Sequence, residues 1–127
     1  MLNFSPSIRI FVHAKPIDMR KSFDGLFGIV SKDFGLDVRQ GGLFLFINHR
    51  RNRLKLLYWD NDGLAIWMKR LEVGCYQHPA PKSDATHLVM DASDLNLLLS
   101  GIDLSSVKRS KRYVVPMINN SSNEARI

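Results

Sequence analysis

The sequence predicts an α+β fold: a mainly antiparallel β-sheet with one long helix packed on it and a short C-terminal helix. Short apolar runs recur along the chain, some alternating with polar residues, and such runs are typical of strands. Residues 19–34 instead repeat apolar side chains every three or four positions, which is the period of an amphipathic helix. Turn sequences between the runs favour hairpins. The expected strands lie near residues 8–14, 43–48, 54–60, 64–71 and 86–90.

The first strand, residues 8–14, is predicted from strict alternation, which places Ile8, Ile10 and Val12 on one face. Asp18 is expected to cap the helix over residues 19–34, and Gly35 is expected to end it. The apolar stripe of this helix consists of Met19, Phe23, Leu26, Phe27, Val30 and Phe34.

The segment GGLFLFINHRRNRLKLLYWDNDG, residues 41–63, predicts a β-hairpin whose connection is residues 48–53. The return strand places Leu54, Leu56 and Tyr58 on one face and Lys55, Leu57 and Trp59 on the other. We therefore expect Lys55 to be exposed together with the connection. Asn61-Asp62-Gly63 predicts a second turn, in which Asp-Gly readily supplies a positive φ.

Residues 64–71 alternate and end before Gly74, which favours a further strand. Residues 86–90 predict a short strand, and Asp91 or Ser93 is expected to cap a helix over residues 93–101. We predict one globular domain over residues 1–104 and a basic, flexible C-terminal tail over 105–127. Tyr58, Trp59, Trp67 and Tyr76 are expected in the core, with stacking on unpaired bases as the alternative.

The charge of the 127-residue chain indicates an anionic partner. Eighteen Lys and Arg face twelve Asp and Glu, which gives a net charge of +6 and a pI near 9.8. The basic residues are clustered, which favours nucleic acid over general solubility. A single cysteine, Cys75, excludes an intrachain disulfide and is typical of a cytoplasmic protein. Neither a signal peptide nor an apolar run of membrane-spanning length is evident, so no membrane partner is expected.

Four stretches resemble a known family: DMRKSFDGL at 18–26, the hairpin segment at 41–63, KRLEVGCYQHP at 69–79 and ASDLNLLLSGID at 92–103. They are similar to the accessory protein, of the Orf-two or TnpB type, of the insertion-sequence sixty-six transposon family. The resemblance implies a bacterial mobile-element protein that works beside a separate, larger transposase and has no established catalytic activity. The chain departs from the family at residues 75–78, where an arginine-rich and aromatic stretch is common.

The densest basic cluster lies in the predicted hairpin. Arginine forms bidentate contacts with phosphate, and a two-stranded ribbon fits the major groove of DNA. We therefore predict that the protein binds DNA through this hairpin, with a solvated turn as the alternative. The candidate nucleic-acid-binding residues are Asn48, His49, Arg50, Arg51, Arg53, Lys55, Lys21, Lys69, Lys108, Arg109, Lys111 and Arg112.

Two other functions compete with direct DNA binding. In the first, the protein is an adaptor whose basic hairpin docks on an acidic surface of the transposase. In the second, Asp60 and Asp62 belong to a metal-dependent nuclease, although a tight turn also favours these residues. The four histidines lack metal-ligand spacing, and Lys69 stands where a calcium loop needs glutamate. We therefore predict no catalytic residues, no metal site and no cofactor, and the sequence leaves the oligomeric state open.

Overall fold

The protein folds as a single five-stranded sheet with a helix on each face. The computed structural model describes residues 4–79 and 85–100. The strands are β1 (Ile10–His13), β2 (Leu43–Ile47), β3 (Arg53–Asp60), β4 (Gly63–Arg70) and β5 (His87–Met90), and their order in the sheet is β4-β3-β2-β1-β5. Neighbouring strands are antiparallel except β1 and β2, which run parallel. The predicted α+β class and mainly antiparallel sheet are confirmed.

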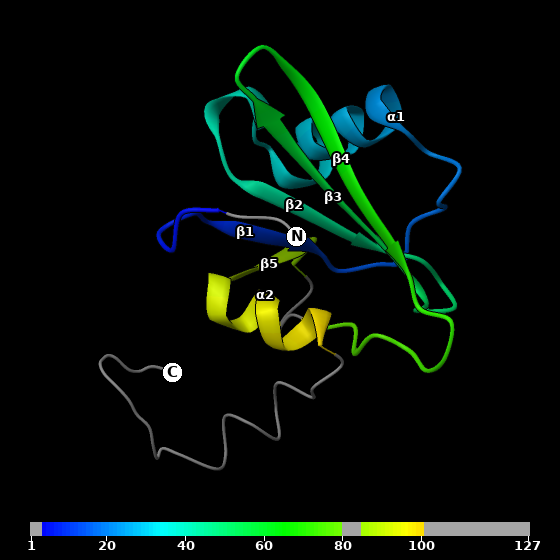
Figure 1. The fold of residues 1–127 in the computed structure, drawn as a ribbon. Coiled ribbons are helices and arrows are strands. Elements are labelled where there is room, and N and C mark those ends of the chain that lie inside the picture. Colours follow the sequence, from blue (N-terminus) through cyan, green and yellow to red (C-terminus); the bar gives the residue numbers. More distant parts are fainter. Residues whose placement is uncertain (1–3, 80–84, 101–127) are drawn as a thin grey trace.

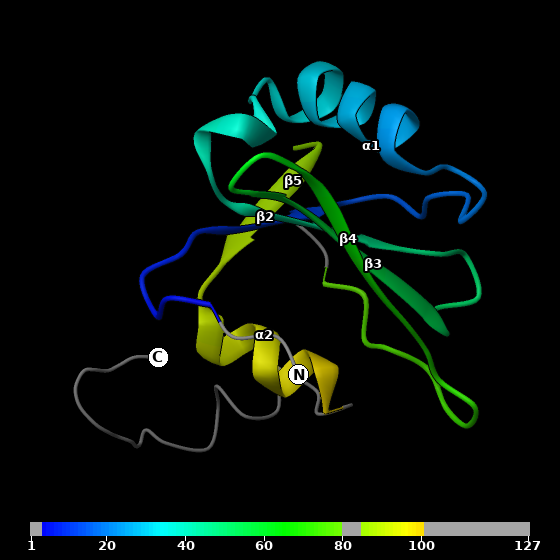
Figure 2. The same ribbon diagram turned by 45° about the horizontal axis from the view of Figure 1, so that its top comes forward.

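The two helices lie on opposite faces of the sheet (Figures 1 and 2). Helix α1 (Phe23–Ile29) continues into a π-helical segment, Val30–Phe34, and connects the parallel strands β1 and β2. Helix α2 (Ala92–Leu99) follows β5 and covers the other face. A one-turn 3₁₀ helix, Val38–Gln40, precedes β2.

Each face of the sheet has its own hydrophobic core, so β2 is buried along its whole length. The α1 side contains Phe44, Phe46 and Leu57, while the α2 side contains Leu45 and residues on α2 itself. A strand covered on both faces needs apolar side chains at every position, which explains the unbroken LFLFI run. The alternation predicted for β3 is also confirmed, because its two sets of side chains enter different cores.

The helix predicted over residues 19–34 begins later than expected. The N-cap of α1 is Ser22, and the first helical hydrogen bond runs from Leu26 N to Ser22 O. Asp18 does not cap the helix; its carboxylate accepts from the backbone N–H and the guanidinium of Arg20 instead. Met19 lies in a separate turn before the helix, closed by a hydrogen bond from Lys21 N to Asp18 O, and its carbonyl accepts from the ammonium of Lys55.

Several smaller predictions are settled by backbone geometry. Gly35 ends the helical segment with a φ of 66°, as predicted. Asp91 caps α2 by accepting from Asp94 N, which resolves the choice between Asp91 and Ser93. In the β3–β4 turn the positive φ of 56° falls on Asn61 and not on Gly63. No helix in the described ranges is long and apolar enough to cross a membrane.

Candidate nucleic-acid interface

The β2–β3 connection is an ordered loop, residues 48–52, held by the side chain of Asn48. The Oδ1 of Asn48 accepts from the backbone N–H groups of Asn52 (3.0 Å) and Arg53 (2.9 Å). Its Nδ2 donates to Asn52 Oδ1 at 2.8 Å. The amide of Asn48 makes these three hydrogen bonds inside the loop, so the predicted contact residue Asn48 supports the backbone that carries the arginines.

The segment after β4 fixes the same loop from outside. The N–H of Tyr76 donates to Arg51 O, the N–H of Leu71 donates to Asn52 O, and the thiol of Cys75 lies 3.5 Å from Arg50 O. Arg51 has a φ of 60°, a left-handed conformation that costs a non-glycine residue about 1–2 kcal/mol. These bonds hold the loop in one shape, which lowers the ordering cost of binding a ligand.

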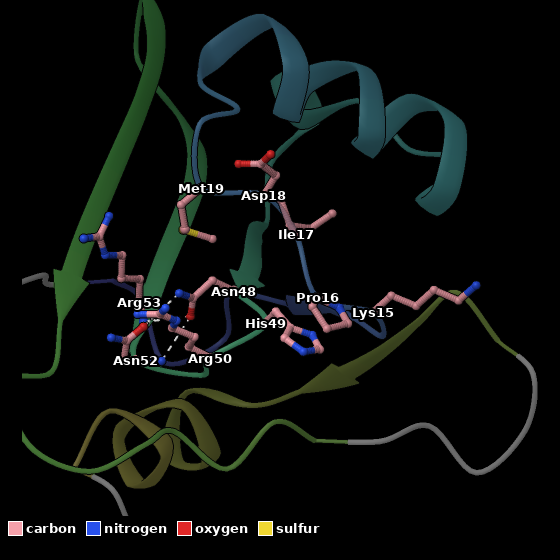
Figure 3. A pocket seen from close by; sticks show the side chains of 10 residues that line it. All are labelled: Lys15, Pro16, Ile17, Asp18, Met19, Asn48, His49, Arg50, Asn52 and Arg53. Carbon is pink, nitrogen blue, oxygen red and sulfur yellow. Dashed lines mark hydrogen bonds between the residues drawn. The ribbon is translucent and has the colours of Figure 1, made fainter.

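A surface hollow of about 700 Å³ runs between this loop and the segment that follows β1. It is lined by Lys15, Pro16, Ile17, Asp18, Met19, Asn48, His49, Arg50, Asn52 and Arg53. Figure 3 shows Lys15 and Arg53 at opposite ends of the hollow, with His49 between them in this view. Arg50 and Arg53 lie together at one end and Lys15 lies at the other, so the cations do not converge on one point (Figure 3). This spacing suits an extended polyanion better than a single small anion.

The wall of the hollow opposite the loop, residues 15–19, is also held by hydrogen bonds. The buried ring of His13 donates from Nδ1 to the carbonyl of Lys15 (2.9 Å), and its Nε2 lies 2.8 Å from a carboxylate oxygen of Asp33. The N–H of Ile17 donates to Ile47 O at 2.9 Å. The two walls meet because β1 and β2 are parallel, so both strands end at the same edge of the sheet.

The arginines of the loop have no acidic partner among the described residues. The ion pairs found there are Arg20–Asp18, Arg39–Asp37, Arg70–Glu72 and His13–Asp33. The Arg20 guanidinium beside Asp18 lowers the pKa of that carboxyl to about 2, so it stays ionised but already paired. Arg50 and Arg51 are exposed and Arg53 is half-buried, which leaves three guanidinium groups available for an external anion.

Two like charges face each other at the end of the hairpin. Arg53 lies directly opposite Arg70 in the β3–β4 register, and like charges in that position destabilise a strand pair. Glu72 offsets Arg70 through a 2.8 Å contact, but no carboxylate of the described chain pairs with Arg53. A bound anion at this edge would reduce the repulsion.

Lys55 was expected to be exposed, and this expectation is wrong. The residue is only 7% exposed, and its Nζ donates to the carbonyls of Met19 (2.9 Å) and Lys21 (2.8 Å). The face of β3 that carries Lys55 was correctly predicted, but the segment leading into α1 covers that face. Lys55 therefore joins two elements and is removed from the candidate interface.

Of the other predicted cations, Lys21 lies next to the hollow and Lys69 does not. Lys21 is exposed and follows the hollow-lining residues 18 and 19. Lys69 is exposed on β4, but its side chain shares a face with Trp67 and lines a separate cavity beside α2. It therefore does not extend the loop surface. Lys108, Arg109, Lys111 and Arg112 lie outside the described residues.

Lys15 was missed by sequence reasoning, whereas the prediction that Tyr76 lies in the core is confirmed. Local patterns could not assign Lys15 to the site, since no pattern in the sequence specified the parallel β1–β2 pair. Tyr76 is completely buried, and burial raises the pKa of its hydroxyl. Its hydroxyl has no hydrogen-bond partner among the described residues.

The residues considered for base stacking and for a metal-dependent nuclease lie elsewhere on the sheet. Tyr58, Trp59 and Trp67 are half-buried on the sheet, and the Trp59 indole donates to Asn61 O. Asp60 and Asp62 are exposed at the β3–β4 turn. Within the described ranges, no three His, Cys, Asp or Glu side chains gather where one metal ion would bind them.

Comparison of the sequence with known proteins identifies its family. The family model described as "IS66 Orf2 like protein" matches residues 8–109. The uncharacterized protein y4jC of Sinorhizobium fredii is 35% identical over 109 residues, covering 86% of this chain and 92% of its own length. The uncharacterized protein y4hO of the same organism is 30% identical over 103 residues, covering 81% and 88%. No solved structure matches.

Proposed function

The chain belongs to the IS66 Orf2-like family of transposition-associated accessory proteins, and we propose that it acts by binding DNA directly. The proposed contact surface is the basic loop, defined as residues 48–53, together with Lys15 and Lys21. In this proposal the protein carries out no chemistry itself. It holds the ends of the mobile element, or the larger transposase, in position on DNA.

One observation carries the proposal. Arg50, Arg51 and Arg53 project from a loop whose backbone atoms take part in seven hydrogen bonds, counting the Cys75 thiol contact. None of the three has an acidic partner in the described chain. A solvated turn that only needs charge for solubility has no requirement for a rigid backbone. A phosphate-binding loop does, because fixed donors lose less entropy when the ligand binds.

The test is the salt dependence of DNA binding. Replacing Arg50, Arg51 and Arg53 by Gln should lower the slope of log K against log salt by roughly 2 to 3, because each neutralised phosphate of duplex DNA contributes about 0.9. Fluorescence anisotropy of a labelled duplex between about 50 and 200 mM salt measures this slope. A labelled single strand of the same length measures the preference between the two forms.

The matched control replaces three exposed cations at the opposite end of the sheet: Arg9, Lys32 and Arg39. Arg9 precedes β1 next to the start of β2, and the other two lie in the helical segments that lead to β2. The charge change is identical, so this variant should retain most of the slope. Equal losses in both variants, or no binding at about 50 mM salt, would favour the adaptor function, in which the loop contacts the transposase.

A further inference from the structure

The outer edge of β4 carries unpaired backbone groups along eight residues. β4 is the last strand of the sheet, and no other described strand pairs with its outer side. Alternate residues of an edge strand direct their N–H and C=O groups outward, where another strand can bind them. The other edge strand, β5, has only four residues and offers much less backbone.

β4 lacks the features that usually protect such an edge. Its pairing with β3 is continuous from Gly63 to Arg70, so no bulge twists the edge away. Its central residues, Leu64 to Met68, include no charge and no proline, and Met68 is 46% exposed. An edge of this length and composition is typical of a surface that accepts another strand.

The charges at the two ends of the edge indicate which strand fits. Asp60 and Asp62 are exposed at the turn where β4 begins, while Lys69 and Arg70 are exposed where it ends. Arg70 contacts Glu72 through its Nε, which leaves the terminal nitrogens of its guanidinium for a second carboxylate. An antiparallel copy of the same strand brings the acidic end of each chain to the basic end of the other. A parallel copy would bring like charges together, which disfavours that arrangement.

We propose that two copies of this chain pair through β4, antiparallel and about a two-fold axis, into one continuous sheet. The register that places Ile66 opposite the partner's Ile66 also places Leu64 opposite the partner's Met68. It places Asp62 opposite the partner's Arg70. These even-numbered pairs lie on one face of the sheet, and the charged pair among them has opposite signs.

The pairing sets the distance between the two basic loops. Arg70 lies four residues from the axis, so the two basic ends are about 26 Å apart along the strands at 3.3 Å per residue. Three strand spacings of about 4.8 Å separate the two copies of β3 across the sheet. The two Arg53 Cα positions are then about 30 Å apart, close to one turn of DNA. The dimer itself does not depend on DNA binding and is tested without DNA.

The experiment is sedimentation equilibrium of the full chain from about 1 to about 300 µM, since small interfaces give roughly micromolar dissociation constants. The unaltered protein is expected to dimerise in this range. Asp62→Lys and Arg70→Asp each oppose like charges across the axis, so each variant alone should be monomeric. An equimolar mixture of the two should dimerise again, because each pair of opposed charges then has opposite signs.

The control is Asp24→Lys, which makes the same charge change at an exposed position on α1 and should leave dimerisation intact. Circular dichroism and a thermal melt verify that each variant is folded. A monomeric native protein throughout the range overturns the proposal and leaves the edge to a strand from another protein. Dimerisation of both single variants, or a mixture that stays monomeric, also overturns it.

Discussion

Lys55 shows that the segments packed around a side chain decide whether a cation is exposed or buried. Its position in β3 gives it the same face as Leu57, and that face packs under the segment that leads into α1. Alternation along the strand predicted the face correctly, because side-chain direction depends only on the backbone. Exposure could not be predicted in the same way, since it depends on which other segment covers that face.

Replacing Lys55 by Met should destabilise the protein by about 1–3 kcal/mol. The change removes two charge-assisted hydrogen bonds and leaves the carbonyls of Met19 and Lys21 without their donor. Chemical denaturation measures the loss. The control Lys21→Met removes an exposed ammonium and should change the free energy of unfolding by less than about 0.5 kcal/mol. A stable Lys55→Met protein with weakened DNA binding would return Lys55 to the interface.

At the scale of the element, the basic loop depends on one amide side chain. Asn48→Ala should remove all three hydrogen bonds made by that side chain and release the backbone of residues 52 and 53. We expect faster hydrogen exchange at these two amides and a loss of about 1–3 kcal/mol of stability. Exchange measured by NMR at residue resolution tests this.

The matched control is His49→Ala, because His49 is exposed in the same loop and makes no hydrogen bond with the described residues. Its amide exchange rates should be close to those of the unaltered protein. If the two variants exchange alike, the loop is held mainly by the segment after β4 and not by Asn48.

The strands were predictable and the start of the first helix was not, for a physical reason. Strand periodicity and turn residues act locally, so all five strands lie close to the predicted ranges. Met19 fitted the helical stripe because it does pack against the α1-side core, but it reaches that core from a turn that precedes the helix. The spacing of apolar residues predicts which side chains are buried. It does not predict the backbone conformation from which each side chain reaches the core.

At the scale of the whole molecule, the candidate site depends on a pairing that the sequence did not specify. The parallel β1–β2 pair brings residues 15–19 beside the loop at 48–52 and creates the hollow. Residues in the loop were recognisable from their own charge, whereas Lys15 gained its place only through this long-range contact. Local patterns therefore predicted one wall of the site and missed the other.

The sheet that is covered on both faces also has a consequence for the chain before it folds. LFLFI, the sequence of β2, is a strongly β-forming and uncharged run, and such runs aggregate when they are exposed. In the unfolded chain only residues 48 and 49 separate this run from Arg50 and Arg51. Charges placed at the end of such a run repel a second copy and act as gatekeepers against aggregation.

The variant that replaces Arg50, Arg51 and Arg53 by Gln should therefore aggregate more during refolding than the variant that replaces Arg9, Lys32 and Arg39. Light scattering after dilution from denaturant, in the absence of DNA, compares the two at equal net charge. Equal scattering would contradict the gatekeeper role. With that role, the arginines that lie beside the hollow in the folded protein protect the nascent chain from self-association during its synthesis.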